Sequence, residues 1–216
     1  MRRLALVLLA ASAVGVAVAP LLMPESYSAL EHSVSESAAQ GVEGAWLARS
    51  AFLLLGFAVL VLDQAVGERW GLWGRIAHRI YGVAMIAVAA YSHMPWQDVP
   101  YDAFEDTLHS VAAGAVGFGF TAGVVAVGIR RGRNPGPIRV LDSIAVLAAV
   151  ILPMVLFNAD GLGGLAQRVL FGIGYAWYAT EAITRPAAGG DAKAGHPPGA
   201  PPGPAAPPPA PNGPRA

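Results

Sequence analysis

The fold class follows from residues 105–131, which read EDTLHSVAAGAVGFGFTAGVVAVGIRR. Between the acidic pair at its start and the arginine pair at its end, this run contains no Asp, Glu, Lys or Arg. A helix needs about 20 mostly apolar residues to cross the hydrocarbon core of a bilayer. The stretch therefore predicts a membrane-spanning helix over residues 108–129.

Similar apolar runs lie on both sides of this one. Of the 216 residues, 55% are hydrophobic and only 13% are charged, whereas soluble domains are roughly one-quarter charged. We expect an all-α, polytopic transmembrane bundle of about six helices. The predicted spans cover residues 4–22, 45–62, 76–91, 108–129, 140–157 and 165–183.

The basic residues predict how the chain threads the membrane, because short cytoplasmic loops retain Lys and Arg. With the N-terminus inside, only Arg49 and Arg168 fall on the outer side. We therefore expect both termini in the cytoplasm and a multi-pass protein of the bacterial cytoplasmic membrane. The basic residues on the inner side are then Arg2, Arg3, Arg69, Arg75, Arg79, Arg130, Arg131, Arg133, Arg139, Arg185, Lys193 and Arg215.

The first span has a second interpretation. Two arginines followed by an apolar stretch that ends in Ala17-Val18-Ala19 are typical of a cleavable secretion signal. Pro20 would then follow the cut, which is a poor context for signal peptidase, and the apolar run continues beyond it. We favour an uncleaved anchor, and cleavage would leave five spans in the same orientation.

The C-terminal region differs in composition from the rest. From residue 186 onward the chain is almost wholly Pro, Ala and Gly, and such a segment neither forms a helix nor buries a core. We expect a transmembrane domain over residues 1–185 and a disordered cytoplasmic tail over residues 186–216.

The charge balance and the absence of cysteine exclude several classes of partner and site. Lys plus Arg equals Asp plus Glu at 14 each, so the chain lacks the net basic field that a nucleic-acid partner requires. The sequence contains no cysteine, which excludes disulfides, thiolate nucleophiles and thiolate metal sites. Any metal would need His and carboxylate ligands.

Small residues in the fourth span predict a contact face. Gly119 and Gly123 form a GxxxG pair, and Ala115 extends the row by one turn. Helices in lipid associate through such close backbone approach. We expect the glycines to pack inside this chain, with homodimerisation as the alternative use.

Polar residues gather at the predicted outer ends of the helices. Asp106 and His109 are three residues apart on one helix face, so the carboxylate can orient the imidazole. His93 ends the third span and is expected at the same depth as His109. The full set of candidates for a ligand site or polar network is Ser35, Glu36, His93, Glu105, Asp106, His109, Ser110, Gln167 and Arg168.

Three interpretations of this polar cluster stay open. It can be a structural network that closes the bundle, or a binding site without chemistry. In the third, His93, Asp106 and His109 hold a divalent metal such as zinc. Glu36 or His32 would then be a further ligand, and a metal-bound hydroxide would hydrolyse an ester or amide. That requires the two imidazoles to lie within about 8 Å of each other.

At these outer segments the chain resembles the bacterial membrane-protein family designated domain of unknown function 998. The resemblance covers residues from about 4 to 185 and leaves the proline-rich tail outside. It implies a six-helix bundle with a shared polar site, and it implies no activity or substrate. The residues that carry it are Tyr27-Ser28, Ser35-Glu36, Ser92-His93, Pro95-Trp96, Glu105-Asp106, Leu108-His109-Ser110 and Gln167-Arg168.

The sequence favours a noncatalytic membrane protein that binds, senses or transports a lipid or small amphiphile at an outward-facing polar site. A metal-dependent membrane hydrolase that uses His93, Asp106 and His109 is the alternative from another class. An accessory subunit of a membrane complex is a third hypothesis. Besides the bilayer and such an amphiphile, the sequence indicates no partner, and it gives no oligomeric state.

Overall fold

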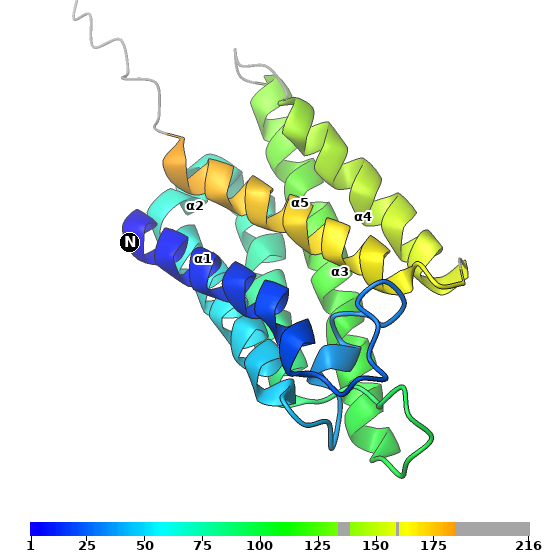
Figure 1. The fold of residues 1–216 in the computed structure, drawn as a ribbon. Coiled ribbons are helices and arrows are strands. Elements are labelled where there is room, and N and C mark those ends of the chain that lie inside the picture. Colours follow the sequence, from blue (N-terminus) through cyan, green and yellow to red (C-terminus); the bar gives the residue numbers. More distant parts are fainter. Residues whose placement is uncertain (134–138, 159, 185–216) are drawn as a thin grey trace, which may run out of the picture. The chain divides into compact units, whose positions relative to one another are not determined.

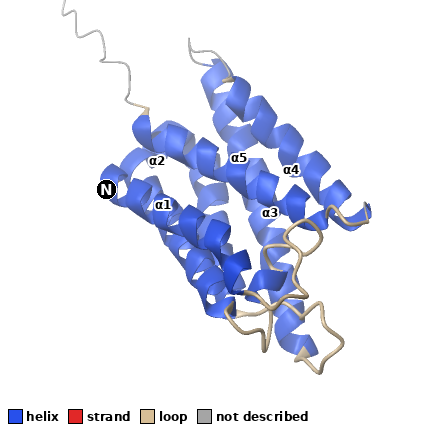
Figure 2. Cartoon of the chain, in the orientation of Figure 1, coloured by secondary structure: helices blue, strands red, loops and turns tan. Residues whose placement is uncertain are grey.

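A computed structural model of the protein describes residues 1–133, 139–158 and 160–184. These residues form five α-helices, two short 3-10 helices and no strand (Figure 1, Figure 2). The all-helical prediction is confirmed for them, and the tail predicted over residues 186–216 lies outside them. The elements are α1 (Arg2–Val18), η1 (Ala19–Leu22), η2 (Glu36–Ala38), α2 (Ala45–Ala90), α3 (Ala103–Arg133), α4 (Val140–Asn158) and α5 (Gly163–Ile183).

The first predicted span, residues 4–22, corresponds to α1 and η1 together. Pro20 lacks a backbone N–H and cannot continue the α-helical hydrogen bonding, so the final turn is a 3-10 helix. The hydroxyl of Ser12 donates to the carbonyl oxygen of Ala51 at 2.6 Å. This buried bond joins α1 to α2.

The long helix α2 covers both the second and the third predicted spans and contains a break at Gly71. Gly71 has φ 70° and ψ 176°, a conformation that is essentially restricted to glycine. A Cβ added to Gly56, before the break, would lie 2.7 Å from the carbonyl oxygen of Gly82, after it. The two halves of α2 therefore pack against each other.

Two ion pairs hold the same two halves together. The buried carboxylate of Asp63 accepts from Arg75 Nε at 3.0 Å and from Arg79 Nε at 2.8 Å. Residues 63–75, which separate the predicted spans, are thus helical on both sides of Gly71. Hydropathy locates only the apolar part of a helix, whereas backbone hydrogen bonds continue into the polar turns.

Three stretches of the described chain are long and apolar enough to cross a membrane, namely Arg2–Leu22, Ala45–Ala90 and Ala103–Gly132. The segment Val140–Leu156 is apolar but shorter. Apolar helices of membrane-spanning length are thus present, as expected. The number of crossings and the orientation stay predictions.

The GxxxG face of α3 packs against the second half of α2, as predicted for these glycines. A Cβ on Gly119 would lie 2.8 Å from the backbone nitrogen of Tyr81 and 2.9 Å from the carbonyl oxygen of Ala77. A Cβ on Gly123 would lie 2.5 Å from a carbon of the His78 ring. The two helices approach so closely because both positions lack side chains.

At one end of the helices, two buried carboxylates bring arginines from different elements together. Glu181, which is 1% exposed, accepts hydrogen bonds from Arg131 and Arg139, each at 2.5 Å, and from the Trp70 indole at 2.9 Å. Asp142 accepts from Arg131 at 2.6 and 2.7 Å. We call these five residues the basic end.

The start of α1 and the end of α5 both lie at the basic end. Arg2 donates to the carbonyl oxygen of Thr184 at 3.1 Å, and Arg69 donates to the same oxygen at 2.7 Å. Arg69 also donates to the Glu181 carbonyl at 2.6 Å. Residues near the two ends of the helical region therefore share one end of the helices.

Candidate functional site

The α1–α2 loop, residues 23–44, and the α2–α3 loop, residues 91–102, lie together at the opposite end of the helices (Figure 2). We call this end of the molecule the polar end. The backbone amide of Gly164, at the start of α5, donates to the Glu31 carbonyl in the α1–α2 loop at 3.0 Å. The amide of Gln40 in the same loop donates to the His93 carbonyl in the α2–α3 loop at 2.9 Å. These bonds bring the predicted outer segments together.

Gln167 and Arg168, both on α5, bind the backbone of the α1–α2 loop. The Oε1 atom of Gln167 accepts from the amides of Val34 at 2.5 Å and Ser35 at 3.2 Å. The Arg168 guanidinium donates to the His32 carbonyl at 2.8 Å and to the Gly164 carbonyl at 3.0 Å. Two of the predicted site residues thus position the loop that carries two others.

Tyr27 completes the contacts of Arg168. The guanidinium donates to the Tyr27 hydroxyl at 2.6 Å, and that hydroxyl donates to the Ser33 carbonyl at 2.9 Å. Burial raises the pKa of the Tyr27 phenol, against the opposing effect of the Arg168 charge. The phenol therefore keeps its proton and stays a hydrogen-bond donor at neutral pH.

A reciprocal pair of hydrogen bonds shapes the loop just before η2. The Ser33 amide donates to Glu36 Oε2 at 2.5 Å, and the Glu36 amide donates to Ser33 Oγ at 3.1 Å. This is the pattern of a capping box. It occupies one oxygen of the Glu36 carboxylate.

The acidic residues at the start of α3 bind the first residues of the α2–α3 loop. His93 Nδ1 lies 2.6 Å from Asp106 Oδ1, which also accepts from the Met94 amide at 2.8 Å. Glu105 Oε1 accepts from the Ser92 amide at 2.7 Å. Because Asp106 already accepts one hydrogen bond there, we assign the proton of the short contact to His93 Nδ1.

His109 lies beside this pair. Its ring stacks on that of His93, with centroids 5.1 Å apart and an interplanar angle of 24°. Its Nδ1 lies 2.9 Å from the carbonyl oxygen of Tyr91. A carbonyl only accepts, so Nδ1 carries the proton and Nε2, which has no partner among the described residues, carries the lone pair.

The structure thus brings the three residues of the predicted metal site, His93, Asp106 and His109, to one place. Within residues 1–133, 139–158 and 160–184, however, no group of three or more His, Asp or Glu side chains is arranged to hold a metal ion. His93 and Asp106 are bonded to each other instead. Metal binding stays a prediction that needs a rearrangement of this pair.

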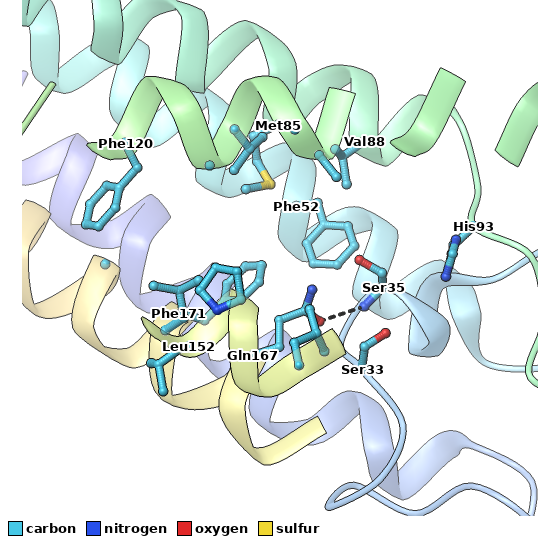
Figure 3. Close-up of a pocket in the computed structure, with 18 of the residues that line it drawn as sticks. Ser33, Ser35, Phe52, Met85, Val88, His93, Phe120, Leu152, Gln167 and Phe171 are labelled. Atoms are coloured by element: carbon cyan, nitrogen blue, oxygen red, sulfur yellow. Dashed lines mark hydrogen bonds between the residues drawn. The ribbon is translucent and has the colours of Figure 1, made fainter. Parts of the chain in front are cut away.

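A cavity of about 670 Å³ extends from the polar end between α2, α3, α4 and α5. In Figure 3 Ser35 and Gln167 lie at one end of the cavity and Phe120 at the other. The polar residues that line it are Glu31, Ser33, Ser35, Glu36, His93, His109, Ser110 and Gln167. The apolar part includes Phe52, Met85, Val88, Phe120, Leu152, Leu156 and Phe171. The cavity is therefore amphipathic along its length.

The model of a family described as "Protein of unknown function (DUF998)" matches residues 4–184. This chain belongs to the DUF998 family. The match confirms the resemblance to domain of unknown function 998 that the sequence predicts. No curated protein and no solved structure matched the chain.

In this DUF998 protein the predicted site residues divide into two groups. Glu105, Asp106 and Arg168 bind backbone or side-chain groups of the neighbouring loops. The rest line the cavity, namely Ser35, Glu36, His93, His109, Ser110 and Gln167. The first group therefore helps to build the polar end, and the second lines the cavity, although Glu36, His93 and Gln167 also bind neighbouring groups.

The apolar part of the cavity was not predicted from the sequence. Gly114, Gly117 and Gly174 line the cavity, and a Cβ on any of them would meet nothing within 4 Å. A glycine in an apolar helix indicates close packing as readily as open space. Only the positions of the facing helices separate these two uses.

Proposed function

We propose that this DUF998 protein is a noncatalytic, six-span protein of the bacterial cytoplasmic membrane that binds a lipid or small amphiphile in the cavity described above. The observation that carries the proposal is the division of the cavity wall into a polar end and an apolar remainder. Pockets for small molecules are mostly apolar, with a few polar groups that orient the ligand. A lipid has the same division between headgroup and chain.

The break in α2 supports six crossings. The halves of α2 before and after Gly71 pack against each other, so each of them is a separate span in this proposal. With α1, α3, α4 and α5 the total is six. An even number of crossings agrees with the contact between Arg2 and Thr184 at the basic end.

Arginine position supports the orientation. The basic end contains Arg131 and Arg139, and Arg69 binds the Glu181 carbonyl beside them. Arginines are the kind of residue that cytoplasmic loops retain. The polar end, and with it the ligand cavity, then faces outward. Both ends of the helical region lie in the cytoplasm in this arrangement.

Single cysteines test the orientation cleanly, because the chain has none of its own. A membrane-impermeant maleimide added to intact cells should label the Ser26→Cys variant in the α1–α2 loop. The Glu68→Cys variant, near Gly71, should react only after the membrane is permeabilised. The reverse pattern would contradict the proposed orientation.

Filling the cavity tests ligand binding. The Gly174→Leu variant places a side chain in the cavity, whereas Gly172→Leu, on the same helix, adds the same atoms at an exposed position outside it. Native mass spectrometry of the purified protein should show bound lipid on the wild type and on Gly172→Leu, and little on Gly174→Leu. Equal occupancy in all three proteins would overturn the proposal.

A metal-dependent hydrolase is the second candidate, because the Asp106 carboxylate holds His93 beside the His109 ring. A carboxylate on one imidazole nitrogen is the usual way to orient a metal-binding histidine. Elemental analysis of the detergent-purified protein and of its His109→Ala variant tests this. Stoichiometric zinc that is lost on substitution would favour the hydrolase, and no metal in either protein would exclude it.

A further inference from the structure

We propose that the amphiphile this cavity accepts carries a cationic, hydrogen-bond-donating headgroup, of which a primary alkylammonium is the simplest example. The inference rests on the proposed function and names the ligand class for the same cavity. It follows from the charges of the residues that line the cavity and from the hydrogen bonds of the two arginines at the polar end.

The charges that line the cavity are acidic. Glu31 and Glu36 contribute carboxylates at the polar end, and no lysine or arginine lines the cavity among the described residues. Protein sites for phosphate and sulfate headgroups normally depend on Arg or Lys. An anionic headgroup would therefore meet like charge in this cavity and no compensating cation.

The two arginines at the polar end, Arg49 and Arg168, already donate hydrogen bonds to neighbouring groups of the protein. The guanidinium of Arg168 donates to two backbone carbonyls and to the Tyr27 hydroxyl. Arg49 donates to the carbonyls of Ala38 and Ala39 at 3.0 and 2.9 Å. Neither guanidinium lines the cavity, and these bonds hold both of them to backbone groups, so no arginine is positioned to bind a headgroup in the cavity.

Hydrogen-bond acceptors, in contrast, stay available at the polar end. The capping box uses only Oε2 of Glu36, which leaves Oε1 for a ligand. His93 donates from Nδ1 to Asp106, so its Nε2 in the neutral ring is an acceptor. An ammonium group, which has three donors and no acceptor, matches this set.

The size of the cavity accommodates the rest of such a molecule. Pockets that hold drug-sized ligands measure about 300–1,000 Å³, and this one measures about 670 Å³. Phe52, Phe120 and Phe171 line its apolar part. An alkyl chain would pack among these rings while its ammonium group stays near Glu36.

The test compares three probes of equal chain length, namely decylammonium, decyl phosphate and the neutral 1-decanoylglycerol. Each is titrated against the full chain in maltoside micelles, and the apparent Kd is taken from the concentration dependence of the Tm. We expect decylammonium to bind about tenfold or more tightly than decyl phosphate, which is the effect of one charge-assisted hydrogen bond.

Two substitutions test whether the carboxylates that line the cavity cause the preference for decylammonium. Glu36→Gln keeps the acceptor for the Ser33 amide and removes the charge, and Glu31→Gln removes an exposed charge at the same wall. Each should weaken decylammonium binding about tenfold and leave the neutral probe unchanged. Glu25→Gln, an exposed residue of the same loop outside the cavity, is the matched control and should change neither.

The outcomes separate this inference from the proposed function. Equal or tighter binding of decyl phosphate, or an unchanged preference in both Gln variants, would overturn the headgroup assignment while the cavity proposal stands. If Gly174→Leu binds all three probes as the wild type does, the cavity is not the binding site and both proposals fail.

Discussion

At the scale of single residues, Gln167 shows how one side chain from a helix organises a loop without secondary structure of its own. Its Oε1 atom accepts from two consecutive backbone amides, Val34 and Ser35. Away from water, an unpaired amide costs about 1–3 kcal/mol. The conformation of this part of the loop therefore depends on a residue more than a hundred positions away.

Replacing Gln167 tests this dependence. Gln167→Met keeps the length of the side chain and removes the acceptor, so the amides of Val34 and Ser35 should exchange with solvent about tenfold or more rapidly. Hydrogen–deuterium exchange in detergent measures the change. Gln167→Glu retains an acceptor and should restore protection, and slow exchange in the Met variant would mean that other contacts hold the loop.

At the scale of one element, α3 uses glycine in two ways within three residues. Gly119 lies against the backbone of α2, whereas Gly117 lines the cavity with nothing within 4 Å of its missing Cβ. The same residue type thus permits close packing on one face of the helix and leaves open space on another.

Alanine substitutions at Gly117 and Gly119 should affect the stability of the protein differently. Alanine has a higher helix propensity than glycine by about 1 kcal/mol, so Gly117→Ala should leave the stability unchanged or raise it slightly. Gly119→Ala should lower it, because the new Cβ would lie 2.8 Å from a backbone nitrogen. Thermal unfolding in detergent measures both, and equal Tm values would contradict the packing described for Gly119.

At the scale of the whole molecule, the basic end connects helices that are far apart in sequence. Glu181 on α5 binds Arg131 on α3, Arg139 just before α4, and Trp70 on α2. A single buried carboxylate therefore contacts groups from α2, from α3 and from the residue before α4. Its removal leaves at least two guanidinium groups without that partner.

The Glu181→Gln variant should lose a large part of its stability. Breaking a buried ion pair by removing one partner costs about 3–5 kcal/mol, and the arginines here also lose hydrogen bonds. Glu68→Gln, an exposed acid on α2, is the matched control and should stay within about 0.5 kcal/mol of the wild type. A Tm for Glu181→Gln equal to that of the control would show that the network contributes little.

The all-helical class, the approximate positions of the apolar helices and the family were readable from the sequence alone. Each depends on local composition, because a long uncharged run such as residues 108–129 implies a spanning helix whatever surrounds it. The gathering of polar residues at one end could also be anticipated, because His93 and Asp106 flank a single short loop. The turn at Gly71 could not, because a glycine allows that conformation without requiring it.

Only the tertiary structure decided which polar groups bind other parts of the chain and which line the cavity. Whether Arg168 binds a carbonyl or an anion, and whether Gly174 faces a helix or a cavity, depends on segments distant in the chain. Hydropathy and spacing report which solvent a residue prefers and which face of its own helix it occupies. The empty volume between four helices is a property of their arrangement, and no single stretch of sequence contains it.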